Sequence, residues 1–77
     1  MSSFELRLSC LNDVGAFVRV ADTVPCEITV KRGSFAVNGK SLMGILSLDL
    51  SAPLLVEVDG PQEEAEQMKS ALQNFLV

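Results

Sequence analysis

The sequence predicts a small α+β domain in which helices cover one face of an antiparallel sheet. Four short stretches alternate apolar and polar residues, as half-buried strands do. Two longer stretches repeat apolar residues at helical spacing, and a short third helix completes the order βαββαβα. Four strands with one apolar face and two substantial helices fit one layer of helices on one sheet. The pattern alone also allows a ferredoxin-like arrangement of the strands.

The first strand and the first helix are both visible as apolar periodicities. Residues 4–8 alternate, which predicts a half-buried strand with its odd members exposed. We expect Asn12 or Asp13 to cap the helix that follows, because their side chains can accept hydrogen bonds from its free N–H groups. Pro25 disfavours helical geometry in the residue before it and so ends the helix. The apolar face of this helix consists of Val14, Phe17, Val18 and Ala21.

A hairpin and a short helix are expected next. Residues 26–31 and 34–37 are strand-like and flank a turn at Gly33, which predicts a β-hairpin. A turn at Asn38-Gly39 leads to a short helix starting near Ser41. Its apolar residues at helical spacing are Leu42, Ile45 and Leu46.

The last third of the chain predicts one strand and one helix. Residues 54–58 alternate, and the sequence Asp59-Gly60-Pro61 then turns the chain. Proline suits a first helical position, and the early glutamates of the helix that follows favour its positive end. The inner stripe of this final helix is expected to be Ala65, Met68, Leu72, Phe75 and Leu76.

Composition and charge narrow the possible functions. Apolar residues make up 48% of the 77 residues, which is typical of a globular chain, and residues 1–77 form one domain. The net charge of −4 argues against a nucleic-acid partner, because phosphate backbones need a basic surface. No basic amphipathic stretch or long apolar run predicts a membrane partner. Without a signal peptide, we expect a cytoplasmic protein.

The residues that carry most enzyme chemistry are scarce. The chain contains no histidine and only two cysteines, Cys10 and Cys26, which we expect to be reduced thiols. Two thiols cannot complete a zinc site, so no metal or other cofactor is expected. No motif of paired catalytic carboxylates is present, and an enzyme is therefore not the expected class.

Residues 40–48, Lys-Ser-Leu-Met-Gly-Ile-Leu-Ser-Leu, closely resemble the regulatory-serine segment of HPr, the phosphocarrier of the bacterial sugar phosphotransferase system. The chain length and the order of elements also resemble HPr. This resemblance implies a single HPr-like open-faced sandwich with sheet order 1-4-2-3. It further implies protein partners, such as HPr kinase, enzyme I or a transcriptional regulator of sugar use.

One departure from the family changes the expected function. The family's catalytic histidine stands in a Gly-Leu-His-x-Arg-Pro-Ala motif, whereas residues 8–17 of this chain contain no His, Arg or Pro. The chain therefore cannot act as a histidine phosphocarrier. Counting back from Phe17 without a gap places Cys10 opposite the histidine, and counting forward places it at the end of the first strand. A phosphocysteine is chemically possible, although no neighbour in the sequence would activate the thiol. For Asp13, capping is the expected role.

Two interpretations of Ser41 remain open. Ser41 could simply cap the short helix, or it could be phosphorylated by a kinase, as the resemblance implies. The resemblance also implies that Lys40, Leu42, Met43 and Leu46 bind partners, although these side chains could instead pack on the sheet. We therefore expect a regulatory, protein-binding relative of HPr, acting as a monomer or weak dimer. The alternative is an interaction module unrelated to sugar transport, with no phosphoryl chemistry.

Overall fold

A computed structural model describes residues 2–77 and confirms the α+β fold with the order βαββαβα. The four strands form one antiparallel sheet in the order β1-β4-β2-β3, which decides against the ferredoxin-like alternative. The elements are β1 (Ser2–Leu6), α1 (Leu11–Thr23), β2 (Glu27–Arg32), β3 (Phe35–Asn38), α2 (Leu42–Leu46), β4 (Leu54–Asp59) and α3 (Gln62–Ala71), followed by one 3-10 turn (Gln73–Phe75). No helix among these residues is long and apolar enough to cross a membrane.

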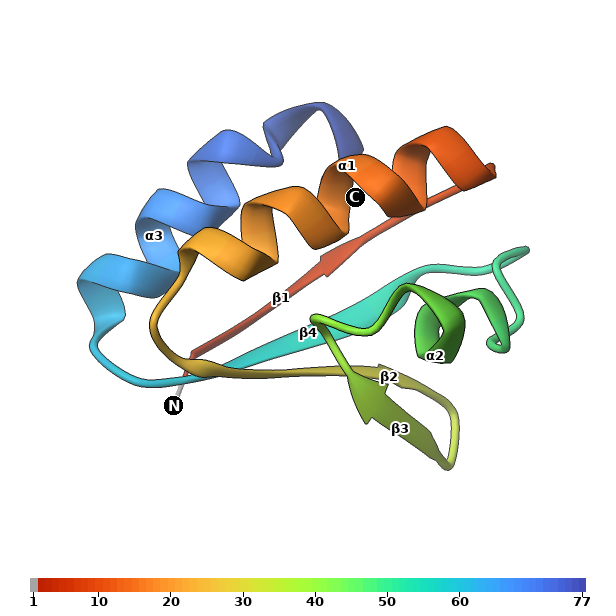
Figure 1. The fold of residues 1–77 in the computed structure, drawn as a ribbon, viewed down its shortest axis with the longest axis horizontal. Coiled ribbons are helices and arrows are strands. Elements are labelled where there is room, and N and C mark those ends of the chain that lie inside the picture. Colours follow the sequence, from red (N-terminus) through yellow and green to blue (C-terminus); the bar gives the residue numbers. More distant parts are fainter. Residues whose placement is uncertain (1) are drawn as a thin grey trace.

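The core lies between one face of the sheet and the helices. Helices α1 and α3 lie side by side over the sheet, and the short α2 lies apart from α3, beside β2 and β3 (Figure 1). Alternate strand residues face these helices, as the period of two requires. The largest fully buried side chains are Leu6, Leu8, Val14, Phe17, Val30, Ile45, Leu54, Val56, Val58, Met68 and Leu72.

Helix α1 begins earlier than the sequence predicts. Cys10 is its N-cap residue and makes no side-chain capping hydrogen bond, so the expected cap at Asn12 or Asp13 is wrong. Asp13 instead lies in the first turn, where its carboxylate accepts a hydrogen bond of 2.9 Å from the backbone N–H of Ser9. This bond runs from the helix back to the preceding loop, as in the second half of a capping box. It satisfies a backbone N–H of the loop that precedes the helix.

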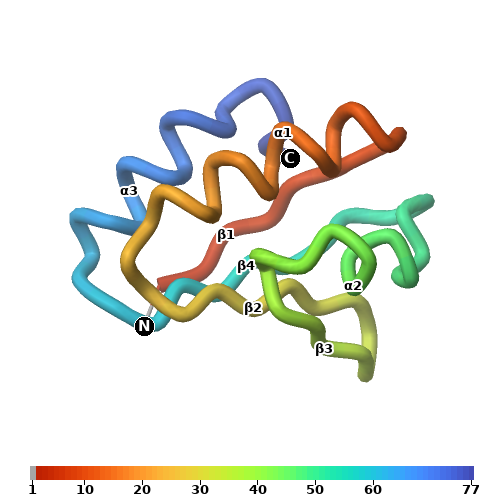
Figure 2. The backbone as a smooth tube through the Cα atoms, in the orientation of Figure 1, coloured from red at the N-terminus to blue at the C-terminus, as the bar shows by residue number. Residues whose placement is uncertain are grey.

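The C-terminal residues leave the helical layer and pair with the sheet. Helix α3 ends at Ala71, so Phe75 and Leu76 do not continue its stripe as predicted, although both pack against the core. The N–H of Arg7 donates to the carbonyl of Phe75 (2.8 Å), and the N–H of Val77 donates to that of Glu5 (3.3 Å). The chain end therefore lies along the outer edge of β1 (Figure 2).

Candidate functional site

The Ser41 segment, residues 40–48, contains α2 and connects β3 to the loop before β4. Ser41 is the N-cap residue of α2, and its Oγ accepts a hydrogen bond of 3.1 Å from the N–H of Gly44. The capping role is thus confirmed. The serine is half-buried at the N-terminal end of the helix.

Gly44 makes this cap compatible with close packing, a role that the sequence analysis did not predict. A Cβ at position 44 would lie 3.1 Å from the Oγ of Ser41 and 3.3 Å from the Cβ of Val37. Because both separations are tighter than ordinary contacts, a larger residue would push α2 away from β3. The glycine therefore lets a five-residue helix contact the sheet and keep its serine cap.

Three apolar side chains of α2 are exposed, and we call them the α2 patch. Met43 is 76% exposed, whereas Leu42 and Leu46 are 38% and 37% exposed. Ile45, on the opposite side of the helix, is completely buried. A helix of this length hides only one stripe, so the remaining apolar residues face solvent. Leu11, the first residue of α1, is 60% exposed, which the sequence analysis did not predict.

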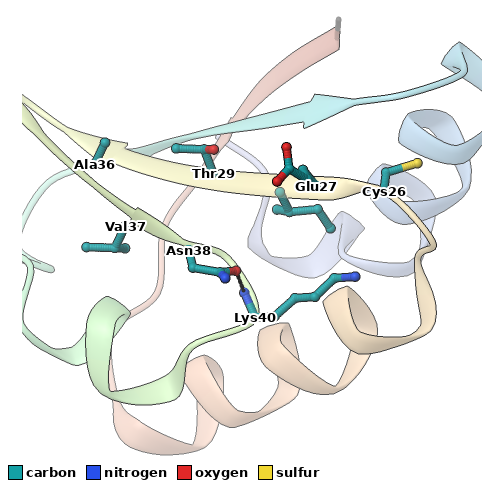
Figure 3. A pocket seen from close by; sticks show the side chains of 8 residues that line it. Cys26, Glu27, Thr29, Ala36, Val37, Asn38 and Lys40 are labelled. Atoms are coloured by element: carbon teal, nitrogen blue, oxygen red, sulfur yellow. Dashed lines mark hydrogen bonds between the residues drawn. The ribbon is translucent and has the colours of Figure 1, made fainter.

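Lys40 has a structural contact that sequence spacing could not reveal. Its Nζ donates a hydrogen bond of 2.7 Å to the carbonyl of Val24, the C-cap residue of α1, and its backbone N–H donates to Oδ1 of Asn38 (Figure 3). An ammonium group at this end of a helix is favourable, because the carbonyls there are unpaired and carry negative partial charge. Lys40 therefore ties the Ser41 segment to α1. In this conformation its charge is directed at α1 rather than at Ser41.

The same lysine borders a cavity of about 420 Å³ at the place where β3 diverges from β2 (Figure 3). Glu27, Thr29 and Ala36 point to the open face of the sheet here, and Val37 does not. The cavity brings Cys26 and Lys40 to one rim without a hydrogen bond between them. No cluster of three metal-ligating side chains occurs within residues 2–77.

The two cysteines occupy different environments. Cys10 is exposed at the N-terminal end of α1. Cys26 is half-buried against the core and leaves no room for a side chain at position 60, because a Cβ on Gly60 would overlap its Sγ. The packing of Cys26 agrees with its expected role as a small hydrophobic residue.

Beyond α2, a short loop carries Asp49, a carboxylate whose pKa is lowered by its neighbours. The hydroxyl and the N–H of Ser51 donate to Oδ1 of Asp49 at 2.6 and 3.0 Å. These two hydrogen bonds lower the pKa of Asp49, with a further small contribution from Arg32. Asp49 and Arg32 are 3.9 Å apart, which makes a loose surface ion pair.

Comparison with known proteins gives a consistent result. Residues 13–77 match a family model described as the PTS HPr component phosphorylation site. No curated protein sequence matches the chain. The crystal structure of HPr-C-His from Thermoanaerobacter tengcongensis is 26% identical, with a TM-score of 0.78 over 96% of this chain and 89% of that one.

Two further structures share the fold. HPr from Bacillus anthracis is 23% identical, with a TM-score of 0.76 over 99% of this chain and 96% of that one. The Bacillus subtilis catabolite repression containing protein Crh, whose structure shows a swapping domain in a dimer, is also 23% identical. Its TM-score is 0.71 over 95% of this chain and 87% of that one.

Proposed function

We propose that this chain, which belongs to the HPr family of the phosphotransferase system (PTS), has a regulatory role. It binds other proteins and does not pass phosphate through a histidine. Members of this family are phosphocarriers that act through protein partners of the phosphotransferase system. This chain contains no histidine at all. What it keeps of the family pattern is the Ser41 segment, and the proposal places its function there.

The observation that carries the proposal is the position of Ser41 directly beside the α2 patch. The hydroxyl caps the helix, while Leu42 and Met43, the next two residues, are exposed apolar side chains. A partner that covered Met43 would also cover the surface next to Ser41. Exposed apolar patches beside a polar group are typical of protein-binding sites.

Phosphorylation of Ser41 would change the charge of this surface without removing the cap. A phosphate adds about −1.5 to −2 charge and three strong acceptor oxygens. Those oxygens can accept from the same N–H of Gly44 that the hydroxyl now uses. We therefore expect phosphorylation to leave the fold intact and to alter partner choice. In this proposal, the patch supplies the contact area and Ser41 supplies the switch.

The test is the intact mass of the protein after two separate incubations. One uses ATP with an HPr-type kinase, and the other uses phosphoenolpyruvate with enzyme I. Ser41→Ala removes the proposed acceptor, and Ser47→Ala is the matched control, because Ser47 also lies at an end of α2 and hydrogen-bonds to Gly44. We expect one phosphate from the kinase alone, absent in Ser41→Ala and present in Ser47→Ala.

Other outcomes contradict the proposal in distinct ways. Phosphate transfer from enzyme I would show that the carrier role persists, and its loss in Cys10→Ala would assign it to that thiol. No phosphate in either reaction would favour the alternative, an HPr-fold interaction module without phosphoryl chemistry. Two contacts support that alternative, since Ser41 is already used as a cap and Lys40 is already bonded to Val24.

A further inference from the structure

The two edges of the sheet are protected unequally. Along the outer edge of β1, the backbone of Glu5 and Arg7 is hydrogen-bonded to the C-terminal residues. Strand β3 forms the other edge and pairs only with β2. In both backbone views no other segment among residues 2–77 runs beyond β3 (Figures 1 and 2). An unprotected edge strand presents N–H and C=O groups that can pair with another chain.

The hydrogen-bond pattern identifies which groups of β3 are free. The N–H of Gly39 donates to the carbonyl of Ile28 at 2.7 Å, so this opposed pair is a hydrogen-bonded one. Because such pairs alternate along an antiparallel ladder, Val37 and Phe35 also bond to β2, and Ala36 does not. The N–H and C=O of Ala36 therefore point away from the sheet. No backbone bond outside the ladder involves them in the described chain.

Apart from its length of four residues, the strand has none of the usual features that block edge pairing. Its sequence, Phe35-Ala36-Val37-Asn38, contains no charge and no proline. Phe35 is 70% exposed, which is unusual for a large aromatic side chain. The preceding turn has Gly33 at its first central position with φ +61°, so the strand is entered from a regular hairpin without a bulge.

A groove of about 720 Å³ runs beside this edge. Residues 32–37 line one side, and Ser47, Leu48 and Asp49, which follow α2, line the other. None of the three residues of the α2 patch lines this groove. Arg32 lies in the groove with its Nε lacking a hydrogen-bond partner, and its ion pair with Asp49 is loose at 3.9 Å. The Nε is itself buried, but the loose contact with Asp49 leaves the terminal nitrogens of the guanidinium with donor capacity for a carboxylate.

We propose that the β3 edge binds an extended segment of a partner protein as an added strand. The segment would pair with the N–H and C=O of Ala36, place an apolar side chain against Phe35 and Leu48, and present an acidic side chain to Arg32. Main-chain hydrogen bonds supply affinity in this mode, and the groove supplies specificity. The proposal does not depend on the function proposed for Ser41.

A second copy of the chain fits this edge less well. Antiparallel pairing of two β3 strands about Ala36 would set Phe35 of one copy opposite Val37 of the other and would offer Arg32 no carboxylate, because β3 contains no acidic residue. The paired strands are only four residues long. Such a contact falls far below the roughly 800 Å² per partner that stable dimers bury. A partner segment with acidic residues supplies the carboxylate that a second β3 strand lacks.

The test is an NMR titration of the isotope-labelled protein with a short blocked peptide in which valine and glutamate alternate at every second position with threonine between them, so that the valine and glutamate side chains share one face of the added strand. We expect amide shift changes in β3 and in residues 47–49. A peptide with N-methylated backbone amides keeps the side chains but loses the donors and should bind roughly tenfold more weakly. Ala36→Pro should weaken binding similarly, because it removes an N–H that the β2 ladder does not use.

Two controls separate this site from its competitors. Met43→Glu alters the α2 patch and should leave peptide binding unchanged. Shift changes centred on α2, or equal binding of the N-methylated peptide, would overturn the proposal. If β3 resonances shift with protein concentration alone, and Ala36→Pro abolishes that dependence, the occupant is a second copy and the partner-segment proposal is wrong.

Discussion

Gly39 shows how a single residue fixes the approach to the Ser41 segment. It is buried, and its N–H continues the β2–β3 ladder by bonding to Ile28. A Cβ at this position would overlap the Cγ2 of Ile28 and lie 3.2 Å from its carbonyl oxygen. Ile28 is itself a core residue and has little freedom to move. The Asn-Gly turn signal in the sequence thus reflects close packing as well as turn geometry.

We therefore expect Gly39→Ala to lower the free energy of unfolding by about 1–3 kcal/mol, the usual cost of overpacking. Gly15→Ala is the matched control, since a Cβ there would meet only Nη1 of Arg19, at 3.9 Å. Because alanine is the better helix former, that variant should be more stable by about 0.5–1 kcal/mol. Urea unfolding measures both. Equal effects in the two variants would contradict the packing argument.

At the scale of a single residue, Asp49 makes a pH-dependent contribution to the free energy of unfolding. Its pKa is lowered chiefly by the side-chain and backbone hydrogen bonds from Ser51. A carboxyl group with a lowered pKa in the folded state stabilises the protein above its unfolded pKa, and this contribution is lost as the pH falls through the folded pKa. Asp49 therefore affects the stability of the protein only at acidic pH, and its contribution does not vary near neutral pH.

Ser51→Ala should raise the pKa of Asp49 toward its ordinary value, because the largest cause of the shift is removed. Carbon-detected NMR titration of the Asp49 carboxyl group measures this directly. Ser47→Ala is the control, since its hydroxyl bonds to Gly44 and not to Asp49. An unchanged Asp49 titration in Ser51→Ala would assign the shift to the backbone N–H of Ser51 and to Arg32 instead.

At the scale of elements, local patterns predicted most of the fold. The strands and helices were expected in the right order, and the hairpin and α2 were placed within a residue or so, because alternation and turn chemistry are local. The start of α1 was missed because Cys10, a poor capping residue, occupies the N-cap position, and Asp13 acts backward on Ser9 instead. The pairing of residues 75–77 with β1 was also missed, because it joins segments far apart in the sequence and no local pattern indicates it.

The candidate site was only partly predictable, because sequence patterns are local and some of its contacts join distant residues. Ser41 as a cap and Met43 as an exposed residue follow from a short helix with too many apolar side chains. The bond from Lys40 to Val24 joins residues 16 apart in sequence and depends on how α1 lies over the hairpin. The exposure of Phe35 is likewise set by sheet order, which came from the family resemblance and not from periodicity.

The two faces of α2 should respond oppositely to a charge. Met43→Glu places a carboxylate on an exposed side chain and should change the free energy of unfolding by no more than about 0.5 kcal/mol. Ile45→Glu buries an unpaired charge in the core and should unfold the protein at neutral pH. Circular dichroism and urea unfolding distinguish the two. If Met43→Glu also unfolds the chain, the α2 patch is part of the core and not a docking surface.

At the scale of the whole molecule, a chain of 77 residues has little stability to lose. A domain of this length is expected to be stable by about 4–12 kcal/mol. Its core is one layer between a four-stranded sheet and three helices, and the other face of the sheet is open. Most of the aromatic bulk of that core comes from Phe4 and Phe17, because the chain has no Trp or Tyr and Phe35 lies outside.

The phenylalanines therefore provide a test of the whole architecture. Phe17→Ala empties the centre of the core and should cost about 3–5 kcal/mol, a large fraction of the total stability. Phe35→Ala removes the same atoms from an exposed edge and should leave the unfolding midpoint nearly unchanged. Differential scanning calorimetry of both variants measures the difference. A comparable loss in Phe35→Ala would mean that the β3 edge is already covered in solution, so that the aromatic ring is buried against a second copy of the chain.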